Sequence, residues 1–368
     1  MAAIFLPFYL CVGTAALTDL YILLNRRRVK EIFRIRHVIW LPVFILIAMI
    51  TGVCFGNYTG LLQSLVILSY TLFALFVQTE ITEKISGGIV DICCALSMVC
   101  TLIGYIQVKM RVDPRAFSTF FNANYFATIC EFAILLSIYG FYRNQKHRWF
   151  YLAALLVNFY GIQISMCRTA WPAVFCGIVV LLFCLRRYKP LMFALSLIVL
   201  ALVLLVVEPK LIVPRFYDFT RQFAQREAIW LIAFHGFLQS PLFGQGSMAY
   251  YFISTGDLQR VHAHNIYLEA LLNYGVVNTL VGMLFIAPHF AGIVKNARRT
   301  PTDALKLGTF AVVLVHGLTD VTVSGFQTGL LFLVICAMTY QKEELYRQES
   351  YLVSIPAGIR GALRRRSH

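Results

Sequence analysis

Long apolar segments separated by short basic loops constrain this chain more than any other feature. A helix needs about 20 mostly apolar residues to cross the hydrocarbon core of a bilayer. Segments that meet this requirement lie at 3–24, 38–56, 60–78, 86–107, 122–142, 148–167, 170–185, 190–207, 264–294, 304–322 and 325–340. The sequence therefore predicts an all-α, polytopic membrane protein with about eleven transmembrane helices, forming a single integral membrane domain over residues 1–368.

The composition agrees with this class. Hydrophobic residues make up 59% of the chain and charged residues only 13%, whereas a soluble domain carries about 25% charged residues. Such a chain cannot cover a water-facing surface. The net charge of +15 would suggest nucleic acid as a partner in a soluble protein. Here the basic residues lie mostly in short loops, so we expect them to set the topology and expect no nucleic acid to bind.

The basic residues also predict the orientation. They gather in one set of connections, namely 25–37, 143–148, 186–189, 295–302 and the C-terminal tail. With eleven spans these connections all lie on one side, which the positive-inside rule makes cytoplasmic. The insert 208–263, the segment 108–121 and the junction around Arg168 then face the outside of the plasma (inner) membrane.

The insert 208–263 is the one long polar stretch, so we predict that it is an extracytoplasmic catalytic loop containing short helices. It contains Arg221, Arg226, an apolar helix from Arg226 to Leu238, the turn Pro241–Gly246 and the run His262-Ala263-His264-Asn265. No phosphate-binding loop or dinucleotide fingerprint occurs in the sequence, and we expect no cofactor.

Arginines on the outer side are the candidate anion-binding groups, since a guanidinium recognises phosphate in a planar, bidentate way. Arg226 begins a helix that we expect on the outer leaflet. Arg168 is expected in a break between two helices, the second beginning near Pro172. Plainer interpretations stay open: Arg226 pairs with Glu227 or a lipid phosphate, and Arg168 extends to the interface as long basic side chains do.

Histidines supply the candidate proton acceptor. A histidine can take a proton from a hydroxyl, and His264 is the candidate for this role, although His264 or Asn265 can equally cap the following helix. His262 would not share a helical face with His264, and a zinc site would need more ligands than the sequence places. His316 and Asp320 are spaced i,i+4 on one predicted helix face. They either support each other inside the bundle or brace the catalytic surface.

Several of these motifs together resemble the O-antigen polymerase and ligase family over roughly residues 115–335. His264-Asn265 is followed after nine residues by Gly275, a spacing typical of that family. Arg226 with Trp230, the Pro-Leu-Phe-Gly-x-Gly turn and the upstream Arg168 also match. The segment 117–127, which contains Asn124, resembles a family helix entry without its glycine. Asn278 departs from the family pattern, which has glycine, threonine or tyrosine more often.

The resemblance implies a metal-independent glycosyl transfer outside the plasma membrane, from a glycan carried on undecaprenyl pyrophosphate. It implies that Arg168 and Arg226 hold the pyrophosphate and stabilise the leaving group, while His264 accepts the proton of the attacking hydroxyl. We assign no metal-binding residue. The side chains to which we assign substrate binding are Arg168, Arg226, Arg221, Asn265, Arg115, Asn124 and Asp320.

The predicted function is polymerisation of lipid-linked repeat units for a cell-surface polysaccharide such as a capsule or exopolysaccharide. A ligase that passes the glycan to another acceptor is the nearest alternative. A transporter of the lipid-linked sugar is a different class, but it would place charged groups at mid-membrane, whereas most charges here lie at the surfaces. A purely structural scaffold is the plainest alternative. The expected partners are the bilayer, the lipid-linked oligosaccharide, a chain-length regulator and a flippase.

Overall fold

The computed structural model describes residues 1–207 and 219–339, and this part of the chain is helical with no strand. Each apolar segment predicted above coincides with one helix: α1 (Phe8–Leu24), α3 (Trp40–Cys54), α4 (Tyr58–Glu80), α5 (Glu83–Lys109), α6 (Ala123–Arg143), α7 (Arg148–Ser165), α8 (Ala170–Cys184), α9 (Tyr188–Val207), α13 (Ile266–Asn296), α14 (Pro301–His316) and α15 (Phe326–Ala337). Residues 208–218 of the insert and the basic tail 340–368 lie outside the described residues.

The other described helices lie before or between these segments: η1 (Ala2–Phe5), α2 (Arg26–Phe33), η2 (Gln145–His147), α11 (Phe219–Gln239), α12 (Ala249–Ile253), η4 (Gly256–Leu258) and η5 (Thr322–Ser324). In the described residues, α4, α5, α6 and α13 are each long and apolar enough to cross a membrane. The pair α1 and α2, bent by 94°, is a fifth candidate. An all-α fold with several helices of membrane-spanning length is thus confirmed, while eleven crossings stay a prediction.

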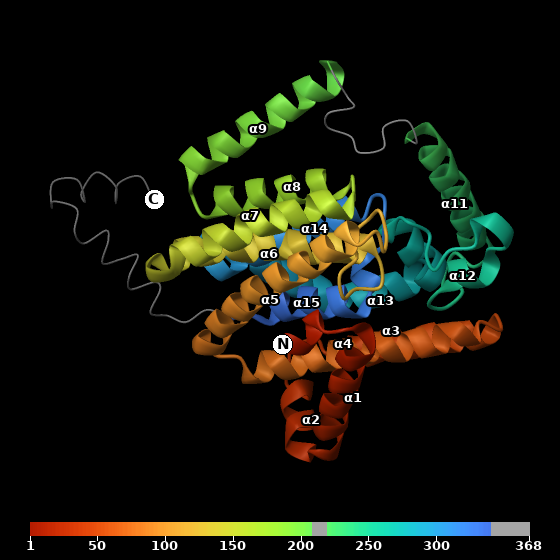
Figure 1. Ribbon diagram of the computed structural model, residues 1–368. Coiled ribbons are helices and arrows are strands. Elements are labelled where there is room, and N and C mark those ends of the chain that lie inside the picture. Colours follow the sequence, from red (N-terminus) through yellow and green to blue (C-terminus); the bar gives the residue numbers. More distant parts are fainter. Residues whose placement is uncertain (208–218, 340–368) are drawn as a thin grey trace, which may run out of the picture.

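Helix α6 is the centre of the bundle. It packs against α5, α7, α8, α14 and α15, and 83% of its apolar window is buried. In Figure 1, α5, α6, α7, α8 and α14 run side by side, and α11 and α12 lie at one end near α13. The helix begins where the Asn122 side chain accepts hydrogen bonds from the N–H groups of Asn124 and Tyr125, which satisfies two free donors of the first turn.

The break between α7 and α8 is where the sequence predicted it. Met166 has a left-handed backbone with φ 52° and ends α7, and Pro172 lies in the first turn of α8. Four residues therefore separate the two helices, at 166–169, and Arg168 is one of them. Thr169 Oγ1 lies 2.7 Å from Thr319 Oγ1, which ties this break to the segment after α14.

A second break, inside α13, explains the glycines in the turn Pro241–Gly246 and at Gly275. Gly275 adopts φ 61° and ψ −173°, so the carbonyls before it and the N–H groups after it leave the helical ladder. The turn Pro241–Gly246 satisfies them. Gln245 and Gly246 donate to Leu272 O and Asn273 O, while Val276 and Val277 donate to Pro241 O and Leu242 O, at 2.8–3.0 Å. The turn and the helix break thus form one interlocked unit.

Gly275→Ala should destabilise this unit. An added Cβ would lie 2.5 Å from the Leu242 carbonyl carbon and 2.6 Å from Gly244 N, and alanine is strained at positive φ, so we expect a loss of more than about 1 kcal/mol. The thermal midpoint of the purified protein measures the effect. Gly292→Ala on the same helix is the matched control, because nothing lies within 4 Å of its added Cβ. Equal midpoints for the two variants would contradict the interlocking role.

Candidate active site

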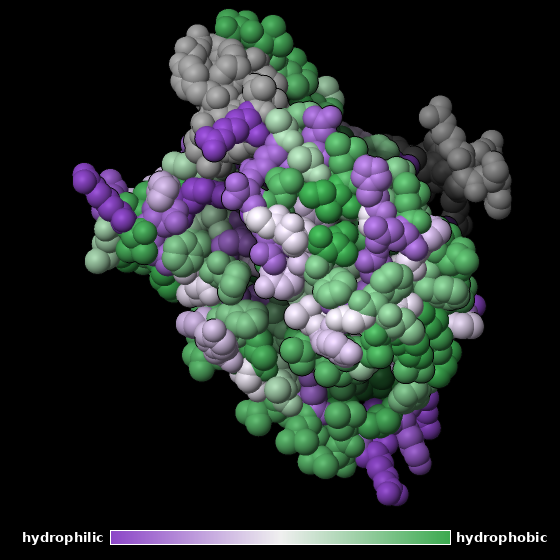
Figure 2. All heavy atoms as spheres, turned by 90° about the vertical axis from the view of Figure 1, so that its right-hand side faces the viewer, coloured by the Kyte–Doolittle hydropathy of each residue, from purple (hydrophilic) through white to green (hydrophobic). Residues whose placement is uncertain are grey.

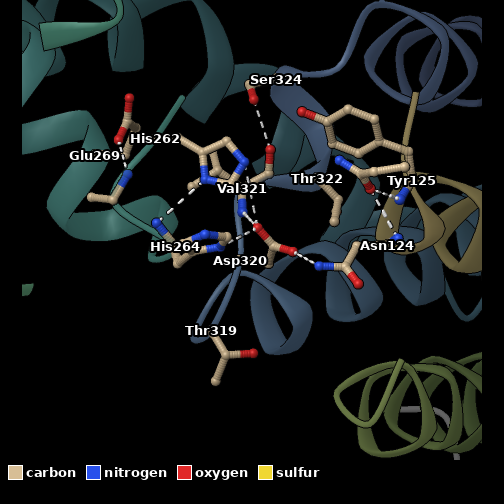
Figure 3. Close-up of polar contacts among 12 residues, drawn as sticks. Asn124, Tyr125, His262, His264, Glu269, Thr319, Asp320, Val321, Thr322 and Ser324 are labelled. Carbon is tan, nitrogen blue, oxygen red and sulfur yellow. Dashed lines mark hydrogen bonds and ion pairs between the residues drawn. The ribbon is translucent and has the colours of Figure 1, made fainter. Parts of the chain in front are cut away.

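The centre of the site is a contact between His264 and Asp320. His264 Nδ1 lies 3.0 Å from Asp320 Oδ1 (Figure 3). The side chain of Asp320 is only 3% exposed and that of His264 is 22% exposed. With its Nδ1 hydrogen bonded to a carboxylate, the imidazole is fixed in the tautomer that leaves Nε2 as the basic atom. The arrangement can therefore accept a proton at His264 and stabilise the resulting imidazolium with Asp320.

Asp320 is held ionised by its surroundings. Oδ1 also accepts a hydrogen bond from the Val321 N–H at 2.9 Å, and Oδ2 accepts one from the Asn124 amide. Burial acts to raise the pKa of Asp320, but the hydrogen bond with His264 and the nearby His262, His264 and His316 hold that pKa well below its ordinary value. A carboxylate in this state is suited to orienting a histidine.

His262 lies in the same cluster, contrary to the expectation drawn from a helical spacing. The two residues precede α13 in an irregular segment, and their rings lie 4.6 Å apart between centroids. His262 Nε2 is 3.6 Å from Asp320 Oδ1, and its Nδ1 accepts from the His264 N–H at 3.3 Å. Burial lowers the pKa of His262 to about 4, and the charges of His264 and Arg226 act in the same direction. At neutral pH this ring is uncharged.

The backbone presents His264 in an uncommon conformation. Its φ is 49°, a left-handed value that few non-glycine residues adopt and that is concentrated at functional sites. Asn265 then caps α13, accepting from the N–H groups of Tyr267 and Leu268, both at 3.0 Å. Its amide donates to Leu318 O at 3.1 Å. Asn265 thus has the capping role considered above, and its contact with substrate stays a prediction.

Two residues that the sequence did not single out brace this segment. Glu269 Oε2 accepts from the Ala263 N–H at 2.7 Å, and Asn273 donates to Glu269 Oε1 at 2.8 Å. Asn273 Oδ1 in turn accepts from the Ala249 N–H at 3.0 Å. A glutamate in the first turn of an otherwise apolar helix was the available signal, because such a charge needs a buried partner.

Arg115 and Asn124 extend the hydrogen-bonded network. Arg115 Nη2 donates to Asn124 Oδ1 at 2.5 Å, and Arg115 Nε donates to Ser165 O at 2.9 Å. Because Asn124 also contacts Asp320, the segment before α6, the α7–α8 break and the segment after α14 meet at one end of the bundle. Arg168, half-buried in that break, lies at this end.

The remaining predicted arginines lie on α11. Arg226 is half-buried and close enough for its charge to act on His262. One turn later, Trp230 Nε1 donates to His264 O at 3.3 Å, which joins α11 to the site. Arg221 is exposed near the start of α11, and its role with substrate stays a prediction. Figure 2 views the α11 side of the molecule, where hydrophilic side chains gather around a hollow in a largely hydrophobic surface.

The predicted pairing of His316 with Asp320 on one helix face is wrong. Helix α14 ends at His316 with Gly317 as its cap residue, so Asp320 lies beyond the helix in the turn that precedes η5. The i,i+4 rule holds only while the helix continues. His316 instead contacts Glu131 on α6, and Asp320 contacts His264 from the ninth apolar segment.

The described residues contain one group of side chains that could hold a metal ion. His262, His264 and Asp320 each offer one ligand atom, and these atoms lie within 4.8 Å of one another. Asp320 is the third ligand that the sequence did not place. The same Oδ1 atom already accepts hydrogen bonds from Val321 N and the His264 ring, so hydrogen bonding alone accounts for the geometry.

EDTA should therefore leave unchanged the glycosyl transfer that the family resemblance implies, since that reaction is expected to be metal-independent. The measurement compares initial rates after dialysis against EDTA with rates after adding back Mg²⁺ or Zn²⁺. A rate lost with EDTA and restored by one ion would instead assign His262, His264 and Asp320 as its ligands.

The fold and the site define an all-α membrane protein with a histidine–aspartate centre at one end of its helical bundle. Residues 153–283 match the family model described as O-antigen ligase. This segment includes Arg168, Arg226 and His264, whereas Arg115, Asn124 and Asp320 lie outside it. The match supports the resemblance to the O-antigen polymerase and ligase family that the motifs predict. No curated protein matches the chain.

Proposed function

We propose that this protein is a glycosyltransferase that polymerises oligosaccharide repeat units carried on undecaprenyl pyrophosphate, at the outer face of the plasma membrane. The observation that carries the proposal is the His264–Asp320 contact of 3.0 Å. It supplies a base with its orienting carboxylate inside a family segment that also contains two arginines. The insert 208–263 then acts as the extracytoplasmic part of the site.

In the proposed reaction, a sugar hydroxyl of the acceptor attacks the anomeric carbon of the donor glycan. His264 Nε2 accepts the hydroxyl proton as the new glycosidic C–O bond forms. The bond between the anomeric carbon and the diphosphate oxygen breaks, and undecaprenyl pyrophosphate leaves with the electron pair. Asp320 stabilises the imidazolium in the way that a buried carboxylate does in other histidine-based sites.

Charge develops on the departing diphosphate, and guanidinium groups suit it because they form two parallel hydrogen bonds to phosphate oxygens. Arg226 lies on α11 one turn before Trp230, whose indole N–H donates to the carbonyl of the proposed base His264 at 3.3 Å. Arg168 lies in a segment joined to the Asp320 turn by the Thr169–Thr319 contact of 2.7 Å. We assign both to the diphosphate.

A ligase is the second candidate, and Asn278 is the residue at which the sequence departs from the family pattern. Asn278 is fully buried and its amide donates to Phe44 O on α3 at 3.3 Å. Asn278 therefore packs between α13 and α3. The departure at Asn278 bears on helix packing rather than on the choice of acceptor, so the choice between polymerase and ligase depends on the assay.

Purified protein in nanodiscs, incubated with lipid-pyrophosphate oligosaccharide, tests the proposal. A polymerase yields a ladder of products on a gel, each longer by one repeat unit. A single transfer to an added acceptor identifies a ligase. Substrate that stays unreacted but crosses the bilayer of proteoliposomes would identify a transporter and overturn the proposal.

A further inference from the structure

Glu131 and His316 form a buried acid–base pair between α6 and α14. His316 Nδ1 is 2.8 Å from Glu131 Oε1, and the side chains are 1% and 0% exposed. Glu131 lies in the middle of α6, the most buried of the membrane-spanning candidates in the described residues. An ionisable residue inside a membrane helix is costly, and it is retained mainly where it has a function.

The pair joins the elements that carry the proposed site residues. Glu131 follows Asn124 by about two helical turns on the same face of α6. On the other side, His316 ends α14, and the Asp320 N–H donates back to His316 O at 3.1 Å. His316 Nε2 lies 3.7 Å from Cys167 Sγ, so the imidazole also reaches the break that contains Arg168. The His316 side chain therefore contacts α6 and the α7–α8 break, and its backbone carbonyl contacts the start of the Asp320 turn.

Stability alone gives a poor account of this pair. Replacing a buried ion pair by apolar residues of similar volume is often neutral or stabilising, whereas removing one partner leaves an uncompensated buried charge. The surrounding core is apolar, with Phe132, Leu135 and Val313 among its buried residues. An aliphatic contact between α6 and α14 would hold these two helices together without ions. A defined hydrogen-bond geometry, in contrast, fixes the position of each group it touches.

We propose that Glu131 and His316 are positioning residues that set the spacing between Arg168 and Asp320, and so align the diphosphate site with the base. The inference rests on the proposed function. The His316 ring contacts Cys167, which precedes Arg168. The His316 backbone continues into the turn that carries Asp320, the residue that orients the proposed base. Loss of either partner lets these two segments shift relative to each other.

The first test is kinetic. Glu131→Gln and His316→Gln should each lower kcat about 10–100-fold, because displacement of catalytic groups by about 1 Å has an effect of that size. The KM for the lipid-linked donor should change by less than about twofold, since neither residue touches it. Tyr139→Phe is the matched control: it removes a 3.0 Å contact between Tyr139 and Thr302 that joins the same two helices away from the site. Wild-type kcat in both pair variants would overturn the inference.

The second test does not depend on activity. N-ethylmaleimide should label Cys167 about tenfold faster in His316→Gln than in the wild type, because the break loses its contact with α14. Cys184, at the other end of α8 and likewise 6% exposed, is the internal control, read in the same digest by mass spectrometry. Unchanged labelling of Cys167 would show that His316 does not hold this segment.

The double variant Glu131→Leu with His316→Phe separates positioning from stability. We expect the thermal midpoint of this double variant to equal that of the wild type, while its kcat stays low. A wild-type midpoint together with a wild-type kcat would mean that the pair only fills space, and the inference would be wrong.

If the wild-type protein transfers no sugar, the proposed function fails, and the labelling of Cys167 alone then decides whether the pair holds the two segments. If His264→Ala is inactive but the pair variants are fully active, the function stands and only the positioning role is lost.

Discussion

His264→Ala should lower the rate of glycosyl transfer by about 10²–10⁴-fold, the range by which a positioned general base accelerates a reaction. The loss should appear in kcat, with the protein still folded and inserted, because His264 is 22% exposed and its removal leaves no large cavity. Asp320→Asn should also be severe, since an amide can donate to Nδ1 and favour the wrong tautomer, which in comparable sites has a large effect. Product ladders and initial rates in nanodiscs measure both effects.

The control for this experiment is His289→Ala. His289 lies on α13, the helix that begins just after His264, and its Nδ1 contacts the Phe285 carbonyl one turn earlier at 2.7 Å. Its rate should equal that of the wild type. A polymer of normal length and yield from His264→Ala would remove the catalytic role of this histidine, whatever the behaviour of Asp320→Asn.

Local features of the fold could be predicted from the sequence because they depend on local chemistry. Hydropathy over about 20 residues locates the apolar helices. Pro172 indicated the α7–α8 break, and the glycines indicated the turn at 241–246. Each of these signals lies within the element that it describes. The number of membrane crossings is less well determined, since α8 and α15 are too short to qualify by length alone.

The contacts of the site could not be predicted in this way, because they join residues far apart in the chain. His264 and Asp320 are 56 positions apart, and Glu131 and His316 are 185 apart. The i,i+4 spacing of His316 and Asp320 predicted two side chains on one helix face, whereas α14 ends at His316. Glu131 and Glu269 are acids within apolar helices, which marks them as costly residues, but no local rule supplies their partners.

Arg226→Lys tests the other half of the proposed mechanism. A lysine keeps the charge but replaces the planar fork by a single ammonium point, so bidentate contact with the diphosphate is lost. We expect kcat to fall by about 10²–10³-fold in Arg226→Ala, as for loss of one group that stabilises developing charge, and by a smaller factor in Arg226→Lys. Arg168→Lys should behave similarly.

The control is Arg260→Lys, in the same insert, where the guanidinium contacts the neighbouring Gln259 carbonyl at 2.6 Å. This variant should retain the wild-type rate, which excludes a general effect of charge in the loop. Wild-type turnover in Arg226→Lys would show that charge alone suffices at this position. In that case Arg226 on α11 would attract the diphosphate through its charge without aligning the leaving oxygen. Arg168 in the α7–α8 break would then align that oxygen.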